Sequence, residues 1–268
     1  MAILEANGTR IHYTDSGPGS GSETIVFSHG LLFSGAMFGK QVEQFKDRYR
    51  CITFDHRGQG GSAVAADGYD MDTLTEDAAA LIEALEVGPC HFAGLSMGGF
   101  VGMRLAIRRP ELLETLMLLE TTADDEPAEN GPKYTQLNFV ARWFGLRLVI
   151  KKVMPIMFSK SFMNDPTRAE DRKYWADRIC ENHKIGVTRA VKGVIHRDGI
   201  YDQIEQINLP TLIIVGEEDT ATVPAKSERM HAKIKGSRLV RVPRAGHSST
   251  IEEPAAVNAA IETFLGEQ

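Results

Sequence analysis

Five uninterrupted apolar runs, each followed by a segment long enough for a helix, restrict the possible folds of this chain more than any other feature. The runs are TIVFS (24–28), CITF (51–54), CHFAGL (90–95), TLMLLE (115–120) and TLIIVG (211–216). A strand with one solvated face alternates apolar and polar residues, so runs without alternation indicate strands that are covered on both faces. The helix-length connections predict a mostly parallel sheet flanked by helices, which is an α/β fold.

Two segments depart from this alternation of strands and helices. At the start of the chain, Asn7-Gly8 lies between two β-rich runs, a strong signal for an antiparallel hairpin. From 123 to 201 a Met-rich and aromatic helical stretch replaces the alternation. We therefore expect a core in two parts, residues 1–122 and 202–268, with a helical lid inserted over residues 123–201.

Composition and charge exclude several classes of partner. The net charge of −6 comes with no basic stripe of the kind that neutralises phosphates, so we expect no nucleic-acid partner. The N-terminus has no apolar signal region, and no window reaches the roughly eighteen apolar residues that span a bilayer. A cytoplasmic protein without a membrane partner is the expectation. Cys51, Cys90 and Cys180 are too scattered for a disulfide framework or a zinc site and are interpreted as small buried hydrophobes.

The sequence GLSMG, residues 94–98, matches the pattern G-x-S-x-G where a predicted strand meets a predicted helix. A serine on such a sharp turn takes a strained conformation with positive φ, and flanking glycines let the strand and helix approach each other. Gly-Ser-Gly clusters are also common in ordinary loops. The strand-to-helix context favours Ser96 as a nucleophile with an exposed hydroxyl group.

A nucleophilic serine needs a base, and the base needs an acid that orients it. His247 lies in a glycine-containing turn after the last predicted strand, where the loops at the carboxyl ends of parallel strands converge. Asp219 follows the penultimate strand directly and gives the order Ser, Asp, His that this motif class uses. The competing carboxylates at similar positions are Glu217, Glu218 and Glu120.

The loop after the first apolar run, FSHGLL, is a second candidate part of the site. The backbone N–H of Leu31 in this loop and that of Met97 are predicted to stabilise an oxyanion. We interpret His29 as a residue that shapes the loop rather than as a catalytic group. The cluster Asp55-His56-Arg57 is likewise interpreted as structural.

The combination of motifs resembles the α/β-hydrolase superfamily over essentially the whole chain. The motifs are SHG (28–30), FDHRGQGGS (54–62), GLSMGG (94–99), IIVGEEDTATVP (213–224) and AGHSS (245–249). Within the superfamily, the segments GLSMGG, DHRGQGGS and INLPTLIIVGEED are most similar to the branch that contains 3-oxoadipate enol-lactonases, N-acyl homoserine lactonases and small carboxylesterases.

The resemblance implies a triad of Ser96, Asp219 and His247, an oxyanion hole made by the backbone of Leu31 and Met97, and a helical lid. It implies no metal and no organic cofactor, and the chain lacks the H-x-H-x-D-H spacing of a zinc-dependent lactonase. Haloalkane dehalogenases carry aspartate at the position of Ser96, which argues against dehalogenation.

These features predict a serine hydrolase that cleaves carboxylic esters or lactones through an acyl-enzyme. N-acyl homoserine lactones and an enol-lactone are candidate substrates, and a small molecule is the expected partner. Cofactor-free haloperoxidases acting as perhydrolases and hydrolases of carbon–carbon bonds share the triad and remain alternatives. A hydrolase-fold receptor that captures a ligand under the lid is an alternative from another class.

The lid is expected to supply an apolar pocket for the acyl group of the substrate. The residues predicted to line this pocket are Trp143, Phe144, Met154, Met157 and Phe158. Basic residues of the lid leave open a substrate that carries a negative charge instead. These residues are Arg142, Arg147, Lys151, Lys152 and Arg168.

Overall fold

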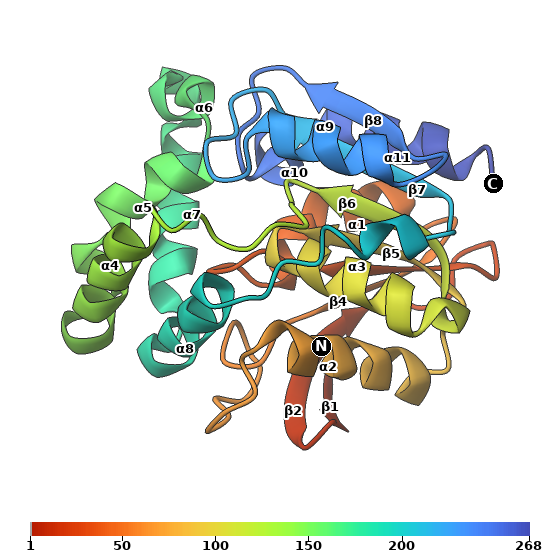
Figure 1. The fold of residues 1–268 in the computed structure, drawn as a ribbon, viewed down its shortest axis with the longest axis horizontal. Helices are drawn as coiled ribbons and strands as arrows, with labels where there is room; N and C mark the ends of the chain where they lie inside the picture. The colour runs from red at the N-terminus through yellow and green to blue at the C-terminus, as the bar shows by residue number, and fades with distance from the viewer. Residues whose placement is uncertain (1) are drawn as a thin grey trace.

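The structure, a computed structural model that describes residues 2–268, contains an eight-stranded sheet in the order β1-β2-β4-β3-β5-β6-β7-β8 (Figure 1). The strands are β1 (Ala2–Ala6), β2 (Thr9–Asp15), β3 (Thr24–Ser28), β4 (Arg50–Phe54), β5 (Cys90–Leu95), β6 (Leu113–Leu119), β7 (Thr211–Gly216) and β8 (Arg238–Val242). Neighbouring strands from β4 to β8 are parallel, and β2 pairs antiparallel with both β1 and β4. The predicted mostly parallel sheet is confirmed.

The β1–β2 hairpin forms where the Asn-Gly pair predicts it. Asn7 and Gly8 have φ values of 44° and 71°, and Ala6 pairs with Thr9 across the turn. Left-handed backbone at both central residues is the geometry of a type I′ turn, which Asn and Gly adopt more easily than other residues. The sheet therefore begins with an antiparallel edge.

Helices cover both faces of the sheet. On one face pack α2 (Met71–Ala84), α3 (Met97–Arg108) and α9 (Pro224–Lys233), and on the other α1 (Gly39–Phe45), α10 (Ser249–Glu252) and α11 (Pro254–Leu265). Ile25 and Phe27 of β3 belong to one buried cluster, while Val26 between them belongs to the other. Both faces of the strand are thus buried, which explains why the apolar runs do not alternate. The described helices include none that is both long enough and apolar enough to cross a membrane.

The helices between β6 and β7 lie together on one side of the sheet, coloured green to cyan in Figure 1. They are α4 (Gly131–Phe144), α5 (Ile150–Met157), α6 (Lys160–Asn164), α7 (Ala169–Glu181) and α8 (Lys184–Ile195). Short 3-10 turns complete the chain at η1 (Gly35–Phe38), η2 (Pro110–Leu112), η3 (Leu146–Leu148), η4 (Pro166–Arg168) and η5 (Ile204–Gln206). All five α-helices fall within the segment predicted as a lid, whose boundaries at 123 and 201 stay a prediction.

Carboxylates from the core hold the start of α6 in place. Glu218 accepts hydrogen bonds from the backbone N–H and the hydroxyl of Ser161, at 2.9 and 2.5 Å. Glu252 accepts one from the N–H of Ser159 at 2.8 Å, and its other oxygen accepts from the N–H groups of Gly246 and Ser248, both at 3.1 Å. The lid segment and the loops at the carboxyl ends of β7 and β8 are therefore joined by two side chains.

The residues around Arg57 brace the core, in agreement with the structural interpretation of this cluster. Arg57 and Asp77 form a buried ion pair with N–O distances of 2.5 and 2.7 Å. Asp55 accepts hydrogen bonds from the N–H groups of Gly35 and Gly61 at 2.7 and 2.8 Å. These contacts attach the loop after β4 to Asp77 of α2 and to the backbone of Gly35.

Arg57→Met is expected to lower the free energy of unfolding by about 3–5 kcal/mol, because Asp77 would remain buried without its cationic partner. The corresponding change in a half-exposed pair, Arg48→Met beside Glu262, is the control and is expected to cost less than about 1 kcal/mol. Urea unfolding of both variants measures the difference. If both variants lose the same free energy of unfolding, burial of the Arg57–Asp77 pair does not explain the loss.

Candidate active site

Ser96 occupies a strained turn between β5 and α3. Its backbone has φ 52° and ψ −110°, outside the regions that residues with side chains prefer. A Cβ at Gly94 would collide with the backbone of Gly98, and a Cβ at Gly98 would collide with the carbonyl of Ser28. The two glycines of G-x-S-x-G are thus required by close approach of the backbone, and this packing holds the serine in its conformation.

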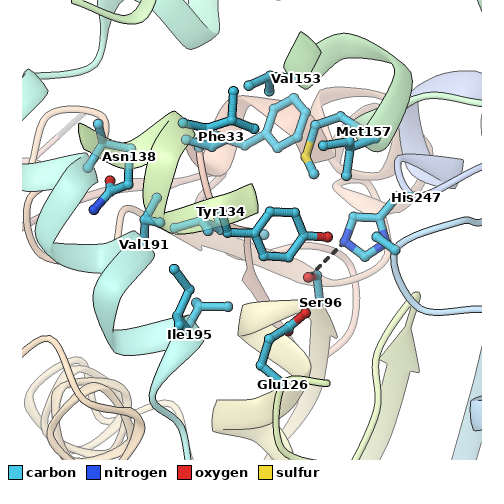
Figure 2. A pocket seen from close by; sticks show the side chains of 18 of the residues that line it. Phe33, Ser96, Glu126, Tyr134, Asn138, Val153, Met157, Val191, Ile195 and His247 are labelled. Carbon is cyan, nitrogen blue, oxygen red and sulfur yellow. Dashed lines mark hydrogen bonds between the residues drawn. The ribbon is translucent and has the colours of Figure 1, made fainter. Parts of the chain in front are cut away.

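A continuous chain of hydrogen bonds joins Ser96, His247 and Asp219. His247 Nε2 lies 2.8 Å from Ser96 Oγ, as Figure 2 shows, and His247 Nδ1 lies 2.9 Å from Asp219 Oδ2. All three residues are buried. The structure brings together the three side chains that the sequence singled out, in a geometry that lets the imidazole accept the serine proton.

The carboxylate of Asp219 is itself held by three donors. The N–H groups of Ala221 and Thr222 donate to Oδ1 at 2.8 and 3.0 Å, and the Thr222 hydroxyl donates to Oδ2 at 2.7 Å. Thr222 was not predicted as a site residue. The sequence did contain a signal for it, because an aspartate that bonds backbone N–H groups two and three residues later is typical of turns.

The competing carboxylates do not contact His247. Glu217 is exposed, Glu218 binds the start of α6, and Glu120 is completely buried. Within residues 2–268, Asp219 is the carboxylate that forms a hydrogen bond with His247. This arrangement supports Asp219 over Glu120 as the acid of the site.

Glu120 is a buried acid beside the site, at the carboxyl end of β6. Its Oε2 accepts a hydrogen bond from the N–H of Gly216 at 2.7 Å, and its backbone has a positive φ of 46°. Burial, reinforced by the nearby carboxylate of Asp219, raises the pKa of Glu120 well above its ordinary value of 4.5. The folded protein therefore holds a proton on Glu120 at pH values where the unfolded chain has released it.

Because the folded state binds this extra proton, Glu120 makes the free energy of unfolding fall as pH rises above 4.5, by at most about 1.4 kcal/mol per pH unit. Glu120→Gln keeps an acceptor for Gly216 but has no proton to lose. We expect its stability relative to the wild type to increase between pH 5 and pH 8, measured by urea unfolding at intervals of about one pH unit. Glu217→Gln, the same change at an exposed site, is the control. If the free energies of unfolding of the wild type and Glu120→Gln change with pH in parallel, Glu120 does not carry the extra proton.

Two backbone amides near the serine have no protein acceptor. Among residues 2–268, neither the N–H of Leu31 nor that of Met97 donates to a protein atom. The Leu31 loop is shaped by His29, whose Nδ1 bonds the carbonyl of Gly30 at 2.7 Å and whose Nε2 accepts from the N–H of His56 at 2.9 Å. Burial lowers the pKa of His29, which favours the neutral ring. The oxyanion role of the two amides stays a prediction.

A cavity of about 130 Å³ extends from Ser96 and His247 beneath the lid helices (Figure 2). Its wall is mostly apolar. The core contributes Leu31, Leu32, Phe33, Leu95 and Phe100, and the lid contributes Leu137, Ala141, Leu146, Val149, Val153, Ile156, Met157, Val187, Val191, Val194 and Ile195. This cavity is the space in which a substrate would meet the serine.

Of the five residues predicted to line the pocket, the structure places one, Met157, at the cavity wall and the other four away from it. Met157 lines the cavity. Trp143 and Phe144 are 64% and 67% exposed and lie outside it. Met154 and Phe158 are buried, but they pack in the hydrophobic core rather than at the cavity wall.

The error for Trp143 follows from the helical period of α4. The inward face of this helix carries Tyr134, Leu137, Asn138 and Ala141, spaced three, four and seven residues after the first. Trp143 comes two residues after Ala141, which turns it to the opposite side of the helix. Aromatic size alone was therefore a poor guide to the pocket.

Sequence reasoning missed the polar part of the cavity wall. Glu126, Tyr134 and Arg197 line the cavity together with Ser96. Arg197 forms an ion pair with Glu126 at 2.8 Å, and its guanidinium lies 4.3 Å from the centre of the Phe100 ring. The five basic lid residues considered for a charged substrate are absent from the wall: Arg142, Arg147, Lys151, Lys152 and Arg168.

The three cysteines, Cys51, Cys90 and Cys180, lie outside the cavity wall. Burial raises the pKa of both Cys51 and Cys90 to about 12, so neither is an effective nucleophile near neutral pH. Cys180 on α7 is partly exposed. The interpretation as buried hydrophobes thus holds for Cys51 and Cys90 and holds in part for Cys180, which is half-buried and packs against the hydrophobic core.

Comparison with known proteins agrees with the fold. The sequence model of the family described as alpha/beta hydrolase fold matches residues 23–254, and the chain belongs to this family. The 3-oxoadipate enol-lactonase 2 of Acinetobacter baylyi is 28% identical over 262 residues, which cover 98% of this chain and 95% of the relative.

Two solved structures are similar over nearly their whole length. The enol-lactonase from Burkholderia xenovorans is 27% identical with a TM-score of 0.91, covering 99% of this chain and 100% of that one. A thermophilic esterase from Thermogutta terrifontis is 26% identical with a TM-score of 0.91, covering 99% and 98%. Relatives of these kinds support a hydrolytic enzyme.

Proposed function

We propose that this protein is a serine hydrolase that cleaves carboxylic esters or lactones through an acyl-enzyme. The observation that carries the proposal is the hydrogen-bonded chain from Ser96 through His247 to Asp219 at the end of an apolar cavity. Relatives named enol-lactonase and esterase support the same class of reaction.

In the first half of the proposed reaction, Ser96 Oγ attacks the carbonyl carbon while His247 Nε2 takes the hydroxyl proton. Asp219 orients the imidazole and stabilises its positive charge. The N–H groups of Leu31 and Met97 donate to the carbonyl oxygen as it becomes negative. Collapse of the tetrahedral intermediate breaks the bond to the alcohol oxygen, which receives the proton from His247.

In the second half, water attacks the acyl-enzyme and His247 acts as base again. The proton then returns to Ser96, and the acid product leaves. A lactone differs from a linear ester because its alcohol stays attached to the acyl group. Water must therefore compete with reclosure of the ring.

The experiment that tests the proposal measures proton release in a pH-stat with a short linear ester, an N-acyl homoserine lactone and an enol-lactone. A fluorophosphonate, which forms a stable adduct with activated serines, provides the link to the site. We expect one adduct per chain, on the peptide that contains Ser96, and loss of turnover in proportion to labelling. Turnover that persists after complete labelling would exclude Ser96 as nucleophile, and ligand binding without turnover would favour a receptor.

A further inference from the structure

Among residues 2–268, one carboxylate, that of Glu126, faces the cavity close to the serine. Glu126 lies in the segment between β6 and α4 and lines the cavity with Ser96. In Figure 2 its carboxylate points toward Ser96. Only 12% of the side chain is exposed, so bulk water shields its charge poorly.

Two donors fix the orientation of this carboxylate. Arg197 Nη1 donates to Oε2 and Asn130 Nδ2 donates to Oε1, both at 2.8 Å. Asn130 lies just before α4 and Arg197 follows α8, so the two donors come from separate segments of the chain. Glu126 is therefore a fixed part of the wall rather than a mobile surface side chain.

Arg197 is the one lysine or arginine side chain among the described residues of the cavity wall, and its Nε and Nη1 are already engaged by the protein. Besides Glu126, its Nη1 donates to the carbonyl of Val194 at 2.8 Å, and its Nε donates to the carbonyl of Asp124 at 3.1 Å. The side chain is 2% exposed. A substrate carboxylate that approached this guanidinium would lie beside Glu126, where two like charges repel each other.

Tyr134 offers the substrate an uncharged hydrogen bond instead. Figure 2 shows its phenol directed toward Ser96 and His247. Its hydroxyl donates to no protein acceptor among residues 2–268. A neutral oxygen of the substrate can accept this bond without placing a second negative charge in the cavity.

The size of the cavity limits the acyl group. An apolar cavity of about 150 Å³ in another protein holds one benzene molecule, and the cavity here measures about 130 Å³. This volume corresponds to an acyl group of about four to six carbons. The end of a longer acyl chain would extend beyond the cavity, because the cavity is not fully enclosed.

We infer that the preferred substrates are esters or lactones with a short, uncharged acyl group, and that Glu126 selects against acyl groups that carry a carboxylate. This inference rests on the proposed function and adds to it the substrate class. The inferred substrate class differs from the one in the name of the relative 3-oxoadipate enol-lactonase 2. Oxoadipate has two carboxyl groups, and a lactone uses only one of them, so that lactone carries a charge.

The test compares two chromogenic esters of equal acyl length, 4-nitrophenyl butyrate and 4-nitrophenyl hemisuccinate, which differ in a terminal carboxylate. For the wild type we expect kcat/KM to be about 100-fold higher for the butyrate, the size of discrimination that like-charge contacts provide. Glu126→Gln retains an acceptor for Arg197 and is expected to narrow this ratio by at least about 10-fold, mainly through faster cleavage of the hemisuccinate. Glu129→Gln, on the exposed side of the same segment, is the matched control and should leave the ratio unchanged.

The outcomes separate this inference from the proposed function. If the butyrate is cleaved and fluorophosphonate blocks its cleavage, the serine hydrolase stands whatever the ratio. Equal or faster cleavage of the hemisuccinate by the wild type would overturn the inference alone. An unchanged ratio in Glu126→Gln, with thermal unfolding like that of the wild type, would also overturn it. Absence of cleavage of every ester and lactone would contradict the proposed function itself.

Discussion

Ser96→Ala is expected to lower kcat for a short neutral ester by about 10⁶-fold, the order of loss that follows removal of the nucleophile in other serine hydrolases. Oγ is the atom that lies 2.8 Å from His247 Nε2, and alanine leaves the base without a proton to accept. Steady-state release of 4-nitrophenol, followed with a stopped assay at high enzyme concentration, measures the residual rate. Retention of even a tenth of the wild-type rate would exclude the assignment.

Ser96→Gly provides a matched variant because it removes the same hydroxyl but changes the backbone. Alanine at φ 52° keeps the strain, whereas glycine adopts positive φ without a steric penalty. Both variants should be equally inactive, and the glycine variant should be more stable than the alanine variant by about 1 kcal/mol in urea unfolding. Both variants lack the hydroxyl, so a difference in residual activity between Ser96→Ala and Ser96→Gly would show that the backbone conformation of the turn also affects the rate.

Asp219→Asn is expected to lower kcat by about 10⁴-fold, with a smaller change in KM. The amide of asparagine can turn an N–H toward His247 Nδ1, which favours the wrong tautomer of the imidazole and removes the charge that stabilises the protonated ring. The backbone N–H groups of Ala221 and Thr222 can still donate to the remaining amide oxygen and keep the loop in place, so thermal unfolding should change little. The same chromogenic assay measures the loss.

The control for Asp219→Asn is Glu217→Gln, which changes an exposed carboxylate in the same loop and should leave kcat within about two-fold of the wild type. Glu120→Gln is the more demanding comparison, because Glu120 also lies at the carboxyl end of a neighbouring strand. A large loss of kcat in Glu120→Gln with little loss in Asp219→Asn would transfer the acid role to Glu120.

The parts of the molecule that could be predicted from sequence depend on short-range patterns. Strands buried on both faces produce continuous apolar runs, and the Asn7-Gly8 pair determines its own turn. The positions of Ser96, Asp219 and His247 followed because loops at the carboxyl ends of parallel strands meet at one edge of the sheet. Knowing the strands placed these side chains at one edge of the sheet, but it did not separate Asp219 from Glu120, Glu217 and Glu218, which also follow strands.

The cavity wall could not be predicted in this way because it depends on how the lid helices are rotated against the core. Tyr134 and Trp143 are both aromatic residues of α4, yet one lines the cavity and the other is exposed. Glu126 and Arg197 are separated by 71 residues and become partners only when the segments before α4 and after α8 meet. A charge pair of this kind leaves no local signal in the sequence.

The side chain of Glu252 forms hydrogen bonds both with the lid and with the turn that contains His247. One oxygen holds Ser159 of the lid, while the other holds the backbone on both sides of His247. Displacement of Ser159 would remove one of the three hydrogen bonds that hold this carboxylate, and with it part of the support of the turn that orients the imidazole. One carboxylate thus couples the position of the start of α6 to the turn that orients the imidazole of His247.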